Sequence, residues 1–289
     1  MSRRVLITGA TGALGRALAS RLLAMPSDFI LFMPGRGNAD DSLDLLDRDQ
    51  IQDAIKRTRP DLILHLAATF SNDFDEAYAV NVAASRHLLD AVVASGQRVR
   101  VVLVGSAAEY GAVTPEENPI SVDHVLRPVS VYGITKAWQT ELAYLHSSRG
   151  SDVVVARIFN LVGPHLSERL FVGRLHQQIN EIRRGERSRI EVGPLSAIRD
   201  YISIDDAVSQ LLTVADIGET GKVYHVASGQ PVTMRDLLVS ELAAHGLDTS
   251  IVIEGAALTN RHGYDVPVIY ADMTQTTALL KKQESHAQH

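Results

Sequence analysis

Three side chains in the middle of the sequence could carry out acid–base chemistry together. Tyr132 and Lys136 are four residues apart, and this spacing places both side chains on one face of a helix. Ser106 follows a β-branched run that predicts a buried strand, so we expect it at the sheet edge where ligands bind. A phenol, an ammonium and an alcohol at one edge indicate proton transfer involving a substrate oxygen.

A glycine-rich turn near the N-terminus could hold a pyrophosphate. The segment Thr8-Gly9-Ala10-Thr11-Gly12-Ala13-Leu14-Gly15 follows a strand-like run and precedes a helical pattern. In this context backbone N–H groups and the positive helix end approach phosphates closely, because glycine leaves no side chain in the way. Glycines at this spacing also occur in ordinary tight turns, but the strand before and the helix after favour a dinucleotide site.

The end of the second predicted strand bears on which dinucleotide binds. An acid there accepts from the free ribose hydroxyls of NAD, whereas an arginine pairs with the 2′-phosphate of NADP. The stretch Phe32-Met33-Pro34-Gly35-Arg36 contains no acid, so we expect NADP(H) with Arg36 and Arg16 at the phosphate. Both arginines have the alternative of being solvated surface charges. Asp44 could accept from the adenine amino group or cap a helix.

Tyr132 needs help to transfer a proton near neutral pH, because the pKa of a free phenol is near 10. The Lys136 ammonium and the positive charge of an oxidised nicotinamide would both lower this pKa. Lys136 could also donate to the nicotinamide ribose. The Tyr-x-x-x-Lys spacing is common on its own, and it gains weight from the glycine-rich turn and Ser106 upstream.

The first half of the chain alternates strand-like and helical runs, as parallel strands with crossover helices do. The predicted strands are Arg4–Thr8, Phe29–Met33, Leu62–His65, Arg100–Val104 and Val153–Arg157. The predicted helices are Gly12–Leu23, Arg48–Thr58, Phe74–Ala94 and Thr135–Arg149. Because several strands are apolar on both faces, we expect an α/β fold with a doubly wound parallel sheet.

The second half is less regular. We expect helices at Glu168–Arg184 and Met234–His245 and strands at Val223–Ala227 and Ile251–Glu254. The predicted division is a dinucleotide-binding domain over residues 1–160, to which 200–227 return, and a substrate lobe of 161–199 and 228–283. The polar residues 284–289 are expected to form a mobile tail.

The composition excludes several kinds of chemistry. The 289 residues include no cysteine, which rules out disulfides, iron–sulfur clusters and cysteine nucleophiles. A net charge of -6 argues against a nucleic-acid-binding protein. The 11 histidines show no metal-ligand spacing, so we expect no metal. No apolar run reaches the roughly 20 residues that span a bilayer, and we expect a cytoplasmic protein that does not contact membranes.

The sequence resembles the extended short-chain dehydrogenase/reductase family, which contains nucleotide-sugar epimerases, dehydratases and 4-keto-sugar reductases. Besides the two motifs above, the resemblance rests on His65-Leu66-Ala67-Ala68, Asn81-Val82, Ser106-Ala107-Ala108-Glu109-Tyr110-Gly111, Arg157 to Pro164, and Val192-Gly193 through Arg199-Asp200-Tyr201. It implies a Rossmann-like fold with Ser106, Tyr132 and Lys136 as catalytic residues. Cofactor contacts are expected from Gly9, Thr11, Gly12, Ala13, Leu14, Gly15, Arg16, Arg36, Asp44, Leu45, Leu66, Ala67, Ala68, Tyr132 and Lys136.

Within this family the residues favour a simple reductase. Dehydratases usually carry an Asp-Glu or Ser-Glu pair after the catalytic hydroxyl residue, and these positions are Ala107 and Ala108 here. The overall resemblance is greatest to GDP-6-deoxy-D-mannose reductases, which implies NADPH-dependent reduction of GDP-4-keto-6-deoxy-D-mannose to GDP-D-rhamnose. A 4-epimerase and a dTDP- or UDP-sugar 4-ketoreductase are the alternatives. A non-catalytic NADP(H) sensor is a further one, although such proteins typically lose the tyrosine or lysine.

The resemblance also implies substrate contacts and a partner. We expect Ser106, Ala107, Asn160, Arg199 and Arg261 to contact the nucleotide sugar, although Arg199 could instead pair with Asp200 or Asp205. The helices at Phe74–Ala94 and Thr135–Arg149 carry apolar residues beyond one stripe, so we expect a homodimer with a second copy packed there. Both helices could instead be fully covered within one chain.

Overall fold

A parallel sheet of six strands, in the order β2-β1-β3-β4-β5-β9, forms the centre of the molecule. The computed structural model describes residues 2–35, 42–255 and 266–287. The strands of this sheet are β1 (Arg3–Thr8), β2 (Phe29–Phe32), β3 (Leu62–His65), β4 (Arg100–Ser106), β5 (Val153–Ile158) and β9 (Val223–Val226). The predicted doubly wound parallel sheet is confirmed.

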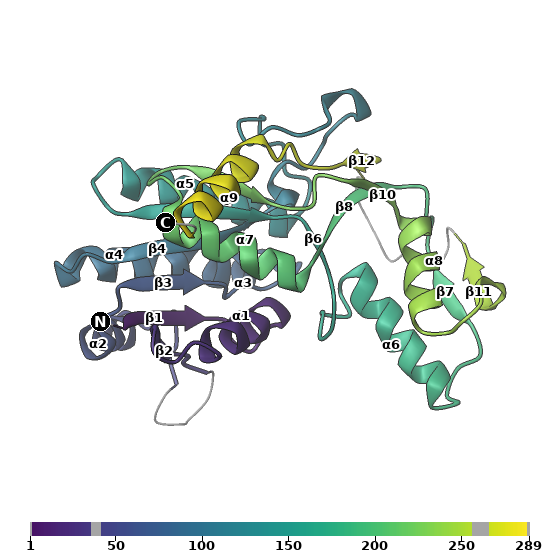
Figure 1. Ribbon diagram of the computed structural model, residues 1–289, viewed down its shortest axis with the longest axis horizontal. Helices are drawn as coiled ribbons and strands as arrows, with labels where there is room; N and C mark the ends of the chain where they lie inside the picture. The colour runs from purple at the N-terminus through teal and green to yellow at the C-terminus, as the bar shows by residue number, and fades with distance from the viewer. Residues whose placement is uncertain (1, 36–41, 256–265, 288–289) are drawn as a thin grey trace.

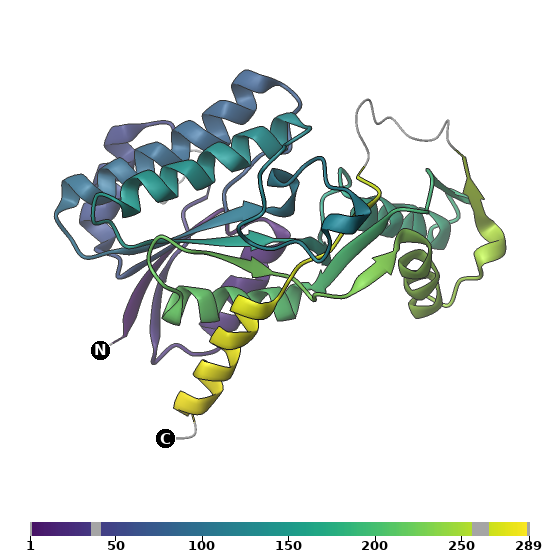
Figure 2. The ribbon, with the colours of Figure 1, turned by 90° about the horizontal axis from the view of Figure 1, so that it is seen from above.

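Helices cover both faces of this sheet, and we call the sheet with its helices the Rossmann body (Figures 1 and 2). One layer contains α1 (Ala13–Leu23), α7 (Ile204–Ile217) and α9 (Thr274–Ala287); the other contains α2 (Arg48–Thr58), α3 (Phe74–Tyr78), a π-helical turn (Ala79–Ala83), α4 (Ala84–Ser95) and α5 (Val131–Ser147). Alternate strand residues point to opposite layers. Val5 and Ile7 of β1 therefore join the core under α1, while Leu6 joins the core under α2 and α4.

The starts of two helices follow from side-chain caps. The Asp47 carboxylate accepts from the backbone N–H groups of Asp49 and Gln50 at 3.0 and 3.1 Å, so α2 has the predicted bounds. The Ser130 hydroxyl accepts from the Gly133 N–H at 3.0 Å and starts α5 at Val131, before the predicted Thr135. The β-branched and aromatic residues at this end hid the start from the sequence pattern. The cap places both Tyr132 and Lys136 within the helix.

A smaller unit, which we call the small lobe, lies beyond the carboxyl ends of the strands (Figure 1). It contains α6 (Phe171–Arg183), α8 (Met234–Ala244) and the parallel pair β7 (Ile190–Val192) and β11 (Val252–Glu254). Leu175 and Ile179 of α6 pack with Leu238 and Leu242 of α8 in a core of its own. The two units therefore have separate apolar centres.

A second sheet connects the body and the small lobe, and the sequence pattern did not predict it. In it β8 (Ile198–Ser203) pairs with β10 (Pro231–Thr233), β12 (Val268–Ile269) and β6 (Asn160–Val162). Three of its strands have only two or three residues. Such short strands carry too little alternation to be distinguished from loops.

The position of α9 corrects the expected division of the C-terminal part. Leu279 is buried in the same core as Leu211 and Val214 of α7, and the Thr213 hydroxyl donates to Gln283 Oε1 at 2.6 Å. Residues 274–283, expected in the substrate lobe, thus pack on the Rossmann body, and 284–287, expected in a mobile tail, are helical. The polar composition of the segment concealed its single apolar stripe.

Candidate active site

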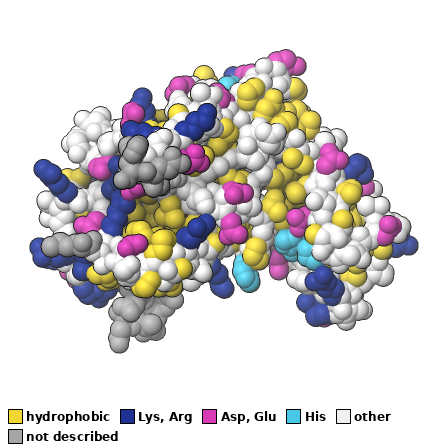
Figure 3. All heavy atoms as spheres, in the orientation of Figure 1, with side chains coloured by type: hydrophobic (Ala, Val, Ile, Leu, Met, Phe, Trp, Pro, Cys, Tyr) yellow, Lys and Arg dark blue, Asp and Glu magenta, His cyan; other side chains and the backbone are white. Residues whose placement is uncertain are grey.

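A cleft of about 1090 Å³ opens at the carboxyl ends of the sheet strands and is lined by residues of both units. Gly9 and Leu66 follow β1 and β3, between which the strand order reverses, and Arg199 and Met234 line the opposite side. Figure 3 shows the surface hollowed between the Rossmann body and the small lobe. Ligands of open α/β sheets bind at such a reversal in strand order.

The glycine-rich turn is built to bring backbone, rather than side chains, to this cleft. Gly9 has φ 74° in the left-handed region, and a Cβ there would lie 2.6 Å from the Ala67 backbone nitrogen. A Cβ on Gly15 would overlap the Gly9 carbonyl oxygen. Gly12 is the N-cap of α1 and provides no side-chain cap, so the first N–H groups of the helix face the cleft. This arrangement fits the pyrophosphate of a dinucleotide.

Ser106, Tyr132 and Lys136 come together in the cleft. Ser106 ends β4 and its hydroxyl oxygen accepts from the Ala108 N–H at 3.2 Å, which leaves the hydroxyl proton available for another group. The Ser106 side chain lies close enough to the Tyr132 phenol to act on its pKa, and the Tyr132 ring lies against Phe70 with the ring centroids 4.6 Å apart. The Lys136 side chain extends from the next turn of the same helix.

The Lys136 ammonium is held by two acceptors that leave one of its three protons for the cleft. Lys136 Nζ donates to the Val104 carbonyl oxygen at 2.6 Å and to Gln139 Oε1 at 2.7 Å. Gln139 in turn donates to Ser85, whose hydroxyl lies 3.0 Å from Nε2 of His65. Burial lowers the pKa of Lys136 to about 8, with the Glu109 charge acting in the opposite direction. Lys136 therefore titrates close to physiological pH.

Tyr132 does not have the lowered pKa that the sequence led us to expect. Burial raises its pKa above the ordinary value of 10; the hydrogen bond with Ser106 opposes this rise, and the Glu109 charge adds to it. The Lys136 ammonium uses two of its N–H groups to donate to Val104 and Gln139. The surrounding protein thus favours the protonated phenol, the form that donates a proton.

The cleft collects most of the other predicted site residues. It is lined by Gly9, Gly12, Ala13, Leu14, Gly15, Leu66, Ala68, Ala107, Asn160 and Arg199. The Asn160 amide donates to the Asp200 carbonyl oxygen at 3.0 Å. The Asp200 carboxylate accepts from the N–H groups of Ser228 and Gly229, both at 2.8 Å, and so fixes the strand that carries Arg199.

Some predicted cofactor residues do not line the cleft, namely Thr11, Arg16, Asp44, Leu45 and Ala67. Arg16 Nε donates to the Thr11 carbonyl oxygen at 2.8 Å on the exposed side of the turn. Asp44 accepts from the Leu46 N–H at 2.9 Å, and the cap of α2 is Asp47 instead. Arg36 and Arg261 lie outside the described residues.

Sequence reasoning missed several residues of the cleft, among them Phe70, His165 and Arg169. Phe70 follows the predicted His65–Ala68 segment, while the other two lie in a loop before α6 with no recognisable pattern. The charges that line the cleft are Lys136, Arg169 and Arg199, and none of its described lining residues is an aspartate or glutamate. This cleft suits an anionic ligand, although the whole chain has a net charge of -6.

Comparisons with known proteins agree with this geometry. The sequence profile of the NAD dependent epimerase/dehydratase family matches residues 5–227, which include the glycine-rich turn, Ser106, Tyr132 and Lys136. The chain belongs to this family. Family membership confirms the expected resemblance and makes the chain an NAD(P)-dependent enzyme of the nucleotide-sugar reductase, dehydratase and epimerase group.

Individual relatives within the epimerase/dehydratase family are similar over most of the chain. The GDP-6-deoxy-D-mannose reductase of Pseudomonas aeruginosa is 29% identical over 246 residues, which cover 82% of this chain and 79% of that protein. The dTDP-6-deoxy-L-talose 4-dehydrogenase (NAD(P)(+)) of Kitasatospora kifunensis is 27% identical over 267 residues, covering 86% and 81%. The solved structure of RMD from Pseudomonas aeruginosa complexed with NADPH superposes with a TM-score of 0.84 at 24% identity, covering 96% and 91%, and supports the fold.

Two further findings concern other kinds of site in this epimerase/dehydratase family member. Within the described residues, no group of three or more His, Asp and Glu side chains could hold a metal ion. Within the same ranges, no helix has both the length and the apolar character needed to cross a bilayer.

Proposed function

We propose that the chain reduces the C4 ketone of a nucleotide-linked 4-keto-6-deoxy sugar with NADPH. The substrate that we favour is GDP-4-keto-6-deoxy-D-mannose, and the product is GDP-D-rhamnose. The proposal depends mainly on one observation: Ser106, Tyr132 and Lys136 share a cleft with the glycine-rich turn, and no described lining residue is a carboxylate. The similarity to the GDP-6-deoxy-D-mannose reductase supports the choice of sugar nucleotide.

The three side chains have distinct roles in this proposal. The reduced nicotinamide supplies a hydride to the ketone carbon when the cofactor is bound. The Ser106 hydroxyl donates to the ketone oxygen and stabilises the negative charge that develops there. Tyr132, which the protein keeps protonated, gives its proton to that oxygen. Lys136 uses its remaining proton to orient the nicotinamide ribose, and its charge stabilises the phenolate that results.

Among the described residues that line the cleft there is no acid, and this favours reduction over dehydration within this family. Loss of water from a sugar requires one group to remove a proton and another to protonate the leaving hydroxyl. Ala107 and Ala108 occupy the cleft beside Ser106. The neighbouring acid, Glu109, is fully buried and bound to Arg157, so it is not available to a sugar in the cleft. Reduction needs only the phenol as a proton source.

The polar side chains on the far side of the cleft support an anionic nucleotide substrate. We propose that Asn160 and Arg199 contact the diphosphate, Arg199 through a charge-assisted hydrogen bond, and that Arg261, which lies outside the described residues, is a further contact. Arg169 and Arg199 give this side a positive potential. The preference for GDP depends on the similarity to the reductase.

NADPH is proposed over NADH for two reasons. The described residues after β2, Met33 to Gly35, include no acid that would accept from the ribose hydroxyls of NAD. Arg16 lies on the exposed side of the glycine-rich turn, within the first turn of α1. A 2′-phosphate there would be paired by Arg16 together with Arg36.

A homodimer is also proposed. Phe74, Tyr78 and Trp138 are 44%, 41% and 42% exposed. The rings of Phe74 and Tyr78 each contact the Trp138 ring edge to face. A group of exposed aromatic residues that contact one another, as these do across α3 and α5, is typical of an interface. The layer of α4 and α5 forms the outside of the molecule in Figure 2. A second copy, related to the first by a two-fold axis, would cover this layer.

One assay tests the activity and the substrate together. Purified protein is given GDP-, dTDP- and UDP-linked 4-keto-6-deoxy sugars with NADPH or NADH, and cofactor consumption and product structure are measured. We expect NADPH consumption with the GDP-linked ketone and a C4 alcohol as product. Consumption only with dTDP- or UDP-linked ketones would refute the GDP assignment. Tight NADPH binding with no consumption would indicate a sensor, and epimerised sugar without net consumption would indicate an epimerase.

A further inference from the structure

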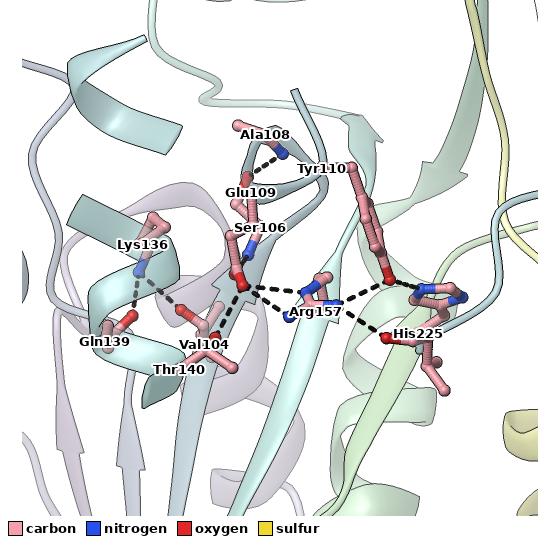
Figure 4. Close-up of polar contacts among 11 residues, drawn as sticks. Val104, Ser106, Ala108, Glu109, Tyr110, Lys136, Gln139, Thr140, Arg157 and His225 are labelled. Atoms are coloured by element: carbon pink, nitrogen blue, oxygen red, sulfur yellow. Dashed lines mark hydrogen bonds and ion pairs between the residues drawn. The ribbon is translucent and has the colours of Figure 1, made fainter. Parts of the chain in front are cut away.

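A buried carboxylate binds the backbone N–H of Ser106 and connects three elements of the fold. Glu109 has no exposed surface. Its Oε1 accepts from the Ser106 N–H at 2.7 Å, and its Oε2 accepts from the Thr140 hydroxyl at 2.8 Å. Arg157 donates to the same Oε2 from Nε at 3.1 Å and from Nη2 at 2.7 Å (Figure 4). Glu109 thus joins the end of β4 to α5 and β5.

The position of Glu109 depends on tight packing. A Cβ on Gly105 would lie 2.6 Å from Glu109 Oε1, so only glycine allows the carboxylate to reach the Ser106 N–H. The turn from Ser106 to Glu109 is also closed by the Ala108 N–H, which donates to the Ser106 hydroxyl oxygen. Because both ends of this turn are fixed, the N–H and the hydroxyl oxygen of Ser106 are both held at the end of β4.

Arg157 balances the charge of Glu109 and has further hydrogen-bond partners of its own. It donates to the Tyr110 hydroxyl at 2.8 Å and to the Val122 carbonyl oxygen at 3.3 Å. The Tyr110 hydroxyl lies 2.5 Å from Nε2 of His225. Figure 4 shows this row of side chains running from Ser106 and Glu109 through Arg157 to Tyr110 and His225. An ion pair buried this completely costs desolvation energy, which makes a role beyond stability reasonable.

We infer that Glu109 is a positioning residue that sets the orientation of Ser106, and that the Glu109–Arg157 pair sets the pH range over which Tyr132 and Lys136 work. This inference rests on the proposed reduction, because it assigns an effect on the proton transfer. In the proposed reaction neither Glu109 nor Arg157 touches the substrate or the cofactor. Glu109 acts through a backbone hydrogen bond and through its charge.

The charge effect has a definite sign. Thr140, which donates to Glu109 Oε2 at 2.8 Å, lies one helical turn after Lys136 on α5, so the carboxylate is held near the Lys136 end of this helix. The negative charge of Glu109 raises the pKa of both Tyr132 and Lys136, so it makes loss of a proton from either group harder. Arg157 contacts Glu109 directly, and Tyr110 and His225 follow Arg157 in the same row of side chains. The charge of Glu109 also acts on the titratable groups Tyr132, Lys136 and Tyr144. Burial lowers the pKa of His225 to about 4, so this imidazole stays neutral in the working range. Arg157 is therefore the cation that limits the effect of Glu109.

Two substitutions at Glu109 separate position from charge. Glu109→Asp keeps the charge but is too short to reach the Ser106 N–H, so we expect kcat to fall about tenfold with KM for NADPH unchanged. The alkaline limb of the pH–rate profile should stay in place. Glu109→Gln keeps an oxygen for the Ser106 N–H but removes the charge, so we expect that limb to move about 0.5 to 1 pH unit toward acid.

A matched control lies in the same row of side chains. Tyr110→Phe removes the hydroxyl that bonds Arg157 and His225 but leaves the ion pair in place. It should lower the melting temperature without moving the alkaline limb. The charge effect would be overturned if the alkaline limb of the pH–rate profile lies at the same pH in wild type and Glu109→Gln. It would also be overturned if Tyr110→Phe shifts this limb as far as Glu109→Gln does. If Glu109→Gln does not fold, Glu109→Asp still tests the positioning role. A folded Glu109→Asp variant with the same kcat as wild type would overturn it.

Failure of the proposed reaction gives a different result. In that case the wild-type protein binds NADPH but reduces none of the ketones. Crystal structures of the wild type and Glu109→Asp then test the inference directly. We expect Ser106 Oγ to move away from the Tyr132 hydroxyl in Glu109→Asp, and an unchanged separation would refute the positioning role.

Discussion

The Tyr132 phenol makes the first prediction at the scale of single residues. Tyr132→Phe removes the proposed proton donor but keeps the ring that packs against Phe70. We expect kcat for ketone reduction to fall about 10²- to 10⁴-fold, the usual contribution of a general acid. NADPH affinity, measured by fluorescence titration, should change little. Full ketone reduction by Tyr132→Phe would show that another group supplies the proton.

The Lys136 ammonium predicts how the reaction depends on pH. Burial lowers the pKa of Lys136 to about 8, so its charge is present below this pH and is lost as pH rises through it. The charge stabilises the phenolate that Tyr132 becomes, and kcat for reduction should therefore decline above about pH 8. In Lys136→Arg the side chain stays charged, because the pKa of arginine is above 12. A decline at the same pH in Lys136→Arg would assign the limb to a different group.

At the scale of elements, the glycine-rich turn predicts how α1 reaches the cofactor. A methyl group on Gly15 would overlap the Gly9 carbonyl oxygen, so Gly15→Ala must push α1 away from β1. We expect a loss of about 1–3 kcal/mol in the free energy of unfolding, as for other overpacked sites, and NADPH affinity at least tenfold weaker. Gly12→Ala is the control for stability, because a Cβ there lies 3.5 Å from the same oxygen. Equal melting temperatures for both variants would contradict this account.

The elements that a local pattern defines were predictable from the sequence. The bounds of β3 and α2 match the prediction, because β3 is a short apolar run and Asp47 marks the start of α2. Ser106, Tyr132 and Lys136 were identified because each follows a strand or begins a helix. The motifs contained both Glu109 and Arg157, but they did not show that the two residues pair, because these residues are 48 positions apart and lie in different elements. Contacts of this kind depend on how strands pair, which no local pattern contains.

On the scale of the whole molecule, the division into two units explains where the reaction is proposed to occur. The Rossmann body provides the glycine-rich turn, Ser106 and the two residues of α5, whereas Arg199 and Met234 line the opposite side. The sheet around β8 spans the two units, since β6 leaves the body beside Asn160 and β10 leads into α8. Asn160 and Arg199 are therefore placed by a connection that neither unit forms alone. This is why the proposed substrate contacts were harder to derive than the catalytic residues.

The exposed aromatic residues of the whole molecule predict its assembly. Trp138 of α5 contacts Phe74 and Tyr78 with ring centroids 5.9 and 6.0 Å apart, and all three rings remain more than 40% exposed. We expect a particle of twice the 31.4 kDa chain mass in light scattering after gel filtration. Trp138→Glu places a charge in the proposed two-fold interface, where each copy would bury it against the other, so the mass should fall to that of one chain.

A matched substitution shows whether that effect belongs to the aromatic surface or to any exposed apolar residue. Leu23 is 56% exposed at the end of α1, in the opposite helical layer. Leu23→Glu adds the same charge and removes a similar apolar side chain, so it should leave the particle mass at two chains. If both variants are monomers, either the interface lies elsewhere or both substitutions destabilise the protein in general. Melting temperatures of the two variants distinguish these explanations. A wild-type particle of one chain at micromolar concentration would mean that α3 and α5 are left uncovered.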